Sequence, residues 1–224
     1  FLALKISYIN EIANLCEVLG ADVHDVAKAM GKDGRISEKF LHPGPGFGGS
    51  CFPKDLEALL SISKNNNLSM ETVNAAIVAN KNQKKKMINK LINLFDGNIN
   101  NRKIAVLGLA FKANTDDVRD SSAIDIIKGI LDNGGIVNAY DPIANNEMSN
   151  IFHDIEYFDN LYAAIKNVDG IVIMTEWNEF RSLDLQKIKN IMKGNIILDT
   201  RNILDMNELS SFGFVYDNIG RIKK

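Results

Sequence analysis

Beyond Lys103 the sequence alternates between short apolar runs and segments with helical periodicity, and this alternation limits the fold more than any other feature. Short strands that alternate with helices form a parallel sheet with right-handed crossovers. The sequence therefore predicts a Rossmann-like parallel α/β domain over residues 103–224. Its strands are expected at 104–109, 136–140, 155–158, 170–174 and 196–198, with helices at 123–131 and 161–165.

Residues 1–95 instead place apolar side chains at helical spacing, which predicts a helical domain. Gly20 is typical of a helix C-cap and Asp22 of an N-cap. We therefore expect a helix over 1–20, followed directly by a second helix that stops at Gly31.

A third helix is predicted to begin near Pro53, because proline fits the first helical turn. Its apolar face is formed by Leu56, Leu59, Leu60 and Ile62. A long fourth helix is predicted over 69–95, and its basic run Lys81–Lys86 is expected to be a solvated face. Residues 96–102 contain Asp96-Gly97-Asn98 and predict a linker between the helical domain and the α/β domain.

A glycine- and proline-rich loop, FLHPGPGFGGSCFPKD at residues 40–55, separates the second predicted helix from the third. Glycine allows positive φ angles and close approach of the backbone to a ligand, at a high entropic cost of ordering. Such a loop indicates a binding site. Its segment Gly44–Gly49 matches G-x-G-x-x-G, but no strand precedes it and a helix follows. We therefore regard this match to a dinucleotide fingerprint as accidental.

Cys51 lies at or just before the predicted N-terminus of the third helix, with Lys54 close behind it. Both features favour a thiolate. Asp55 follows four residues later, so helical spacing predicts that its carboxylate lies near the sulfur. A nucleophile beside a carboxylate that orients water is typical of covalent catalysis. From spacing alone, a small buried cysteine is an equally good interpretation.

Ligands of parallel α/β sheets bind outside the carboxyl ends of the strands. Lys112 and Arg201 follow two of the predicted strands and would add positive charge suited to phosphate or pyrophosphate. Phe111 either stacks on a base or sugar or packs in the core. Arg35, just before the loop, either contacts an anion or lies on the surface. The segments predicted at this edge of the sheet are 108–112, 141–142 and 199–201.

The composition is that of an ordinary globular protein, with a net charge of −2 and 24% charged residues. This balance gives no reason to expect nucleic acid or a membrane surface as a partner. Two cysteines do not make a disulfide framework, so we expect a reducing, cytoplasmic compartment. No metal site is predicted, because His24 has no Cys or His at ligand spacing. The apolar area of the helices predicts a homo-oligomer, at least a dimer.

The sequence GFGGSCFPKD, with Arg35-Ile36 and Phe40-Leu41 upstream, resembles the active-site segment of the UDP-glucose dehydrogenases in the nucleotide-sugar dehydrogenase family. The resemblance implies an NAD-dependent enzyme of three domains that oxidises UDP-glucose to UDP-glucuronate by two hydride transfers. This chain would hold the central dimerisation domain and the UDP-binding domain. The resemblance also covers FLALKISYINEIANLCE at the start, GLAFKANTDDVRDSSAID and, near the end, ILDTRNIL.

The same resemblance implies a role for each matching residue. Cys51 would attack the aldehyde intermediate, whose second oxidation gives a thioester, and Asp55 would handle water or protons. Lys54 and Arg119 would contact NAD, whereas Arg35 would reach the substrate of a neighbouring subunit. The contacts to the UDP-sugar would come from Phe40, Leu41, His42, Pro43, Gly44, Phe47, Gly48, Phe111, Lys112 and Arg201.

The chain departs from the family pattern, because the N-terminal NAD-binding domain and its neighbouring catalytic Lys and Asn have no counterpart in it. Phe1 opens inside a helical pattern, which indicates a fragment. The fragment alone is expected neither to bind NAD usefully nor to turn over UDP-glucose. Ser50 argues against UDP-N-acetylhexosamine as substrate, because those enzymes usually carry GGHC loops. That sugar and GDP-mannose remain alternative substrates, and a non-catalytic nucleotide-binding and dimerisation module is the alternative from another class.

Overall fold

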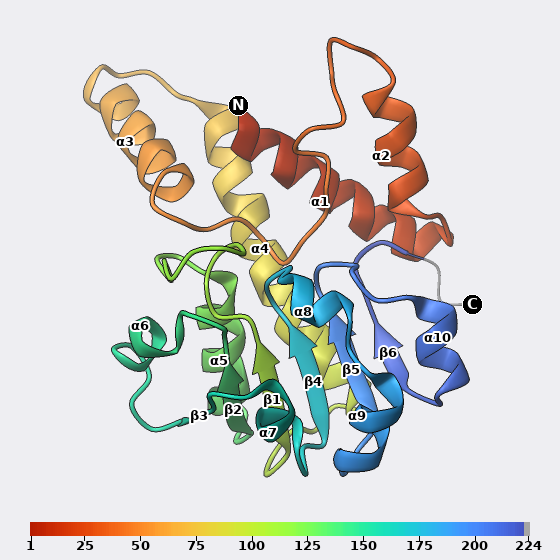
Figure 1. The fold of residues 1–224 in the computed structure, drawn as a ribbon. Helices are drawn as coiled ribbons and strands as arrows, with labels where there is room; N and C mark the ends of the chain where they lie inside the picture. Colours follow the sequence, from red (N-terminus) through yellow and green to blue (C-terminus); the bar gives the residue numbers. More distant parts are fainter. Residues whose placement is uncertain (222–224) are drawn as a thin grey trace.

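The computed structural model describes residues 1–221, so the last three residues of the predicted α/β domain lie outside the described residues. A layer of helices lies against the edge of a six-stranded sheet that carries helices on both faces (Figure 1). This arrangement confirms the α/β fold class. The helical layer consists of α1 (Leu2–Leu19), α2 (Val23–Gly31), α3 (Phe52–Asn65) and α4 (Glu71–Leu94).

The ends of the first helices follow from local sequence signals. Helix α1 ends where Gly20 adopts the left-handed conformation with φ 68°, which glycine reaches without the steric cost of a side chain. The Asp22 carboxylate then accepts the backbone N–H of His24 at 2.8 Å and caps α2. Both predicted boundaries are confirmed. Helix α3 has Pro53 in its first turn, as predicted, and its N-cap residue is Cys51.

The sheet has the strand order β3-β2-β1-β4-β5-β6, and every neighbouring pair is parallel. This is the order of the doubly wound nucleotide-binding folds, whose ligand crevice opens between β1 and β4. Five strands are found where the sequence predicted them. The strands are β1 (Lys103–Leu107), β2 (Ile136–Tyr140), β3 (Glu156–Tyr157), β4 (Gly170–Ile173), β5 (Ile196–Asp199) and β6 (Val215–Asp217).

The sixth strand and four of the helices that surround the sheet were not predicted, because each is short. Helices α5 and α7 lie at the predicted places. The helices that accompany the sheet are α5 (Ser122–Asp132), α6 (Asn145–Ser149), α7 (Leu161–Ile165), α8 (Asn178–Arg181), α9 (Leu185–Ile191) and α10 (Met206–Ser211).

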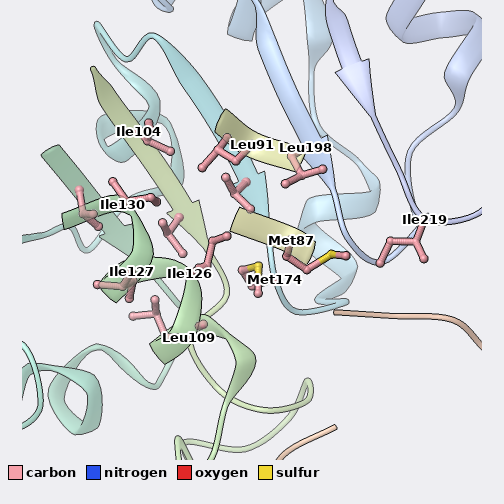
Figure 2. Close-up of a cluster of buried hydrophobic side chains, with 14 of the residues drawn as sticks. Met87, Leu91, Ile104, Leu109, Ile126, Ile127, Ile130, Met174, Leu198 and Ile219 are labelled. Carbon is pink, nitrogen blue, oxygen red and sulfur yellow. The ribbon is translucent and has the colours of Figure 1, made fainter. Parts of the chain in front are cut away.

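One long helix, α4, belongs both to the helical layer and to the covering of the sheet. Figure 2 shows Met87 and Leu91 of α4 beside Ile104 and Leu198 of the strands and Ile126 of α5. All five side chains are buried. The opposite face of the sheet is covered by a second apolar cluster that α7, α9 and α10 contribute to. The helical layer and one face of the sheet therefore share a continuous core.

The basic run on α4 is not a fully solvated face, contrary to the prediction. Lys84 pairs with Asp125 of α5 at 2.8 Å, and Lys86 pairs with Glu17 of α1 at 2.7 Å. The prediction failed because α4 is flanked by helices on two sides, so that alternate lysines point into neighbouring elements. Lys81 is exposed, as expected.

Buried ion pairs join the first helix to the last strand. Glu17 of α1 also accepts from Lys90 Nζ at 3.0 Å, and Lys90 Nζ lies 3.0 Å from Asp217 of β6. The backbone N–H of Val23 donates to the carbonyl of Gly220 at 2.8 Å. These contacts hold α1, α2 and α4 against the last strand, β6, and the segment that follows it.

Candidate functional site

The glycine-rich loop runs from α2 to α3 across the carboxyl edge of the sheet, without regular secondary structure of its own (Figure 1). Residues 41, 43–47 and 49 are buried, whereas His42 and Cys51 are exposed. Buried backbone N–H and carbonyl groups must find hydrogen-bond partners, and an irregular loop cannot supply them all from its own backbone. The partners come from neighbouring helices.

Three amide side chains, which we call the amide clamp, bind the backbone of this loop. Asn10 of α1 accepts the N–H of Gly44 at 2.8 Å, and Gln83 of α4 donates to the carbonyl of Gly44 at 2.8 Å. Asn80 of α4 accepts the N–H of Phe47 at 2.8 Å and donates to its carbonyl at 3.0 Å. Both the backbone N–H and the carbonyl of Gly44, and both those of Phe47, are thus hydrogen-bonded to the clamp. None of the three clamp residues was predicted from the sequence.

Two glycines let the loop pack directly on the α/β region. A Cβ atom on Gly48 would lie 2.1 Å from the carbonyl oxygen of Asp120, and one on Gly49 would lie 2.7 Å from the ring of Phe111. Gly49 also has φ 84° and donates its N–H to the carbonyl of Arg119 at 2.8 Å. Only glycine allows such close approach, which brings Cys51 next to the loops of the sheet.

At the sheet edge, a buried carboxylate shapes the turn that follows β1. Asp141 accepts the N–H groups of Leu109 at 2.7 Å and Ala110 at 3.2 Å, and the indole N–H of Trp177 at 3.1 Å. Neither Asp141 nor Trp177 was predicted to have this role. Because the turn amides are occupied by the protein's own carboxylate, they do not offer a cradle for a dinucleotide pyrophosphate. The turn after β1 therefore lacks the free amides with which a dinucleotide fingerprint holds a pyrophosphate.

Arg201 joins the loop after β5 to the glycine-rich loop. Its Nε donates to the carbonyl of Met174 at 2.7 Å and lies 3.3 Å from Glu176, while Nη2 donates to the carbonyl of Phe111 at 3.3 Å. Its Nη1 is 3.4 Å from the place where a Cβ of Gly44 would be. Burial lowers the pKa of Arg201, and the charge of Glu176 opposes that shift. A partly buried cation thus lies beside Gly44 of the loop at the predicted position.

Cys51 is exposed at the N-terminus of α3, close to two cations. Lys54 Nζ lies 3.3 Å from Asp55 Oδ1, and Arg119 interacts electrostatically with Cys51. The Arg119 guanidinium is held by Asp117 at 2.7 Å, and this hydrogen bond lowers the pKa of Asp117. The backbone N–H of Asp55 donates to the carbonyl of Cys51 at 2.9 Å. Cys51, Lys54 and Asp55 therefore share the first turn of α3, and both charged side chains are exposed there.

The remaining predicted contacts are spread around this region. Arg35 is exposed, pairs with Asp33 at 2.5 Å and lines an apolar hollow beside the start of α1. His42 opens onto a cavity of about 280 Å³ that it shares with His24. Lys112 lines a different cavity, of about 640 Å³, together with Tyr140, Glu176 and Trp177. The structure thus brings Gly44, Phe47, Gly48, Phe111 and Arg201 together near Cys51, whereas Arg35 shares its hollow with Leu41 of the loop.

Other classes of site receive no support from the described residues. None of the helices among residues 1–221 combines the length and apolar character needed to cross a membrane. In this described part of the chain, His, Cys, Asp and Glu side chains form no group of three that could hold a metal ion.

The strand order, the turns at the sheet edge and the cysteine loop together define a doubly wound α/β protein with an exposed thiol on the loop that crosses the carboxyl edge of its sheet. Two family models match the chain: the central domain of the UDP-glucose/GDP-mannose dehydrogenase family over residues 1–82, and the UDP-binding domain of the same family over residues 105–206. The chain belongs to the UDP-glucose/GDP-mannose dehydrogenase family.

Similar proteins carry related names. The chain is 46% identical over 221 residues to a UDP-glucose 6-dehydrogenase of Rhizobium meliloti, a match that covers 99% of this chain and 51% of that protein. The structure of a UDP-glucose dehydrogenase from Pyrobaculum islandicum matches with a TM-score of 0.86 at 33% identity, over 97% of this chain and 48% of that one. An NDP-N-acetyl-D-galactosaminuronic acid dehydrogenase from Methanosarcina mazei matches with a TM-score of 0.88 at 28% identity, over 99% and 48%. The chain spans about half the length of the relatives it matches.

The close approach of Gly48 to Asp120 gives a direct test of the loop geometry. We expect Gly48→Ala to lower the free energy of unfolding by about 1–3 kcal/mol, because the loop must shift to accommodate the new methyl group. Gly34→Ala is the matched control, since a Cβ there would meet no atom within 4 Å. Urea denaturation of both variants measures the effect. Equal stability of the two variants would contradict the packing described.

Proposed function

We propose that this chain carries the nucleophile and the UDP-binding part of an NAD-dependent UDP-glucose 6-dehydrogenase. The observation that carries this proposal is the exposed thiol of Cys51 at the start of α3, at the end of a loop that is held against Phe111 and Arg201. The similarity to proteins named UDP-glucose 6-dehydrogenase favours UDP-glucose over other nucleotide sugars. We further propose that the protein acts in the cytoplasm.

In the proposed reaction, the C6 alcohol of the glucosyl group is first oxidised to an aldehyde. The sulfur of Cys51 then adds to the aldehyde carbon, a C–S bond forms, and the oxygen takes up a proton to give a thiohemiacetal. Loss of a second hydride and of the hydroxyl proton converts it to a thioester. Water attacks the thioester carbonyl, the C–S bond breaks, and the thiol and UDP-glucuronate are released. Asp55 takes the proton of the attacking water.

NAD, when bound, accepts the hydride in each of the two oxidations. The exposed cations Lys54 and Arg119 beside Cys51 fit the phosphate or carboxamide groups of such a cofactor. Because the turn amides after β1 are already bound by Asp141, we propose that the main NAD-binding domain is not the sheet of this chain. We propose that the lysine and arginine hold only the end of the cofactor that faces the thiol.

The UDP group is proposed to bind between the glycine-rich loop and the sheet edge. Arg201 and Lys112 supply positive charge for the diphosphate, and Phe111 provides an aromatic surface. The backbone of residues 40–44, with Phe47 and Gly48, lines the sugar and uridine. Arg35 is exposed and paired with Asp33, and we propose that it reaches the substrate of a neighbouring subunit.

We also propose that the chain forms a homo-oligomer through α1. Tyr8, Leu15 and Val18 lie on the exposed side of this helix, with 47%, 52% and 82% of their surface accessible. An apolar helix face of this kind is typical of a surface covered by another subunit.

A charge placed in this face tests the assembly. We expect Leu15→Glu to shift the protein towards monomer, because burying an unpaired carboxylate in an interface is unfavourable. Leu68→Glu is the control, since Leu68 is 67% exposed and belongs to the connection between α3 and α4 rather than to α1. Light scattering at micromolar concentration measures the mass. A wild-type protein that is monomeric under these conditions would contradict the proposal.

The decisive test of the function replaces the thiol in the full-length protein. We expect Cys51→Ser to retain binding of UDP-glucose but to stall the second oxidation, because a serine hydroxyl is a far poorer nucleophile near neutral pH. Intact mass after addition of UDP-glucose and NAD should show an ester-linked species, or an aldehyde-level product should accumulate. Asp55→Asn should instead slow steps that move water or protons while Cys51 remains open to alkylation. Turnover of Cys51→Ser at the wild-type rate would refute the covalent mechanism.

A second variant tests the UDP site. Lys112→Glu should weaken UDP binding by at least about tenfold, because it replaces an attractive charge near the diphosphate by a repulsive one. Lys128→Glu makes the same charge change at an exposed position on α5 and should leave binding unchanged. Isothermal titration with UDP compares the two. If both variants bind UDP equally well, Lys112 is not part of the site.

A further inference from the structure

The amide clamp hydrogen-bonds to the backbone of the glycine-rich loop in the way that a neighbouring strand does in a sheet. Asn80 presents an acceptor to the N–H and a donor to the carbonyl of Phe47, which is the pairing that one peptide unit offers another. At Gly44 two side chains are needed: Asn10 accepts from the N–H, and Gln83 donates to the carbonyl. The loop is therefore held at two points, three residues apart, by side chains of two different helices.

The orientation of the clamp is fixed by further contacts behind it. Gln83 Oε1 accepts from Asn14 Nδ2 at 3.0 Å, which leaves the Gln83 NH₂ group to donate to Gly44. Asn14 Oδ1 in turn accepts from Lys86 Nζ at 2.6 Å. Asn10 Nδ2, by contrast, is buried without a hydrogen-bond partner within residues 1–221. A buried unpaired donor is costly, so the orientation of the Asn10 amide is set by the hydrogen bond that its Oδ1 accepts from the Gly44 N–H.

The helix that carries most of the clamp cannot easily move. Met87 and Leu91 lie one and two turns beyond Gln83 on α4 and are buried in the core that α4 shares with the sheet. From Phe47 the chain passes through Gly48 and Gly49, which are packed against Asp120 and Phe111, and reaches the thiol. Cys51 itself is exposed, so its place depends on the backbone that precedes it.

We infer that Asn80, Gln83 and Asn10 are positioning residues for Cys51, which act through the loop backbone to place the sulfur for attack on the substrate aldehyde. This inference rests on the proposed function. The first oxidation does not need the thiol, whereas the second does. Loss of the clamp should therefore slow the aldehyde oxidation more than the alcohol oxidation.

The test uses Asn80→Asp and Asn80→Leu in the full-length protein, with Asn82→Asp and Asn82→Leu as matched controls on the exposed side of the same helix. We expect both Asn80 variants to lower the rate of UDP-linked 6-aldehyde oxidation by about tenfold to a hundredfold, since small displacements of a reacting group have effects of this size. The KM for UDP-glucose should change much less. The Asn82 variants should match the wild type.

A pH profile separates positioning from loss of stability. The carboxylate of Asn80→Asp accepts the Phe47 N–H but repels its carbonyl, and protonation restores a donor. The aldehyde oxidation rate of this variant, relative to the wild type, should therefore rise as the pH is lowered from about 8 to about 6. The Asn80→Leu variant has no group that protonates, and its relative rate should stay flat. A flat ratio for both variants would overturn the inference.

Alkylation of Cys51 by iodoacetamide gives a readout that does not depend on activity. Cys16 is buried and burial raises the pKa of its thiol, so the reagent distinguishes the two cysteines. We expect Cys51 to react several-fold more slowly in both Asn80 variants, because the sulfur is no longer held at the start of α3. Unchanged alkylation and an equal loss of both oxidations would overturn the inference and leave a purely structural role. If the wild type oxidises no UDP-glucose, the proposed function fails, and alkylation alone decides the inference.

Discussion

The need to satisfy buried backbone groups governs how this protein builds its site. A loop that is buried without regular structure must take its hydrogen bonds from outside, and the amide clamp supplies them for Gly44 and Phe47. The same solution recurs at the sheet edge, where the carboxylates of Asp141 and Asp199 accept backbone N–H groups of the loops beyond β1 and β5. Every loop around Cys51 is thus held by side chains that bind backbone, which is why the site keeps a defined shape.

Much of the fold could be predicted from sequence because the signals are local. A glycine with positive φ ends α1 at Gly20, an aspartate caps α2 at Asp22, and five apolar runs become strands of the sheet. The sixth strand was missed because Val215–Asp217 contains only three residues, two of them partly exposed and one exposed. Its place depends on pairing with β5, which no local pattern reveals.

The site could be predicted only in part, for a physical reason. Cys51 and the glycines are recognisable as candidate site residues from their residue type. Asn80 and Gln83, by contrast, resemble ordinary polar residues of a helix. Their only signal is that Asn80 falls in the apolar stripe of α4 between Ile77 and Met87, where a polar residue needs an explanation. Their partners lie 33 and 39 residues away along the chain, so the hydrogen bonds depend on the packed fold.

The contacts between α1 and Gly220 have a consequence for synthesis on the ribosome. Gly220 donates to Glu17, 203 residues earlier, and a Cβ on Gly220 would lie 2.6 Å from Ala13. The first two helices therefore leave the ribosome long before the segment that completes their packing exists. Contacts so distant in sequence form late and slowly. The helical layer, although made before the sheet, cannot complete its packing until Gly220 has been made.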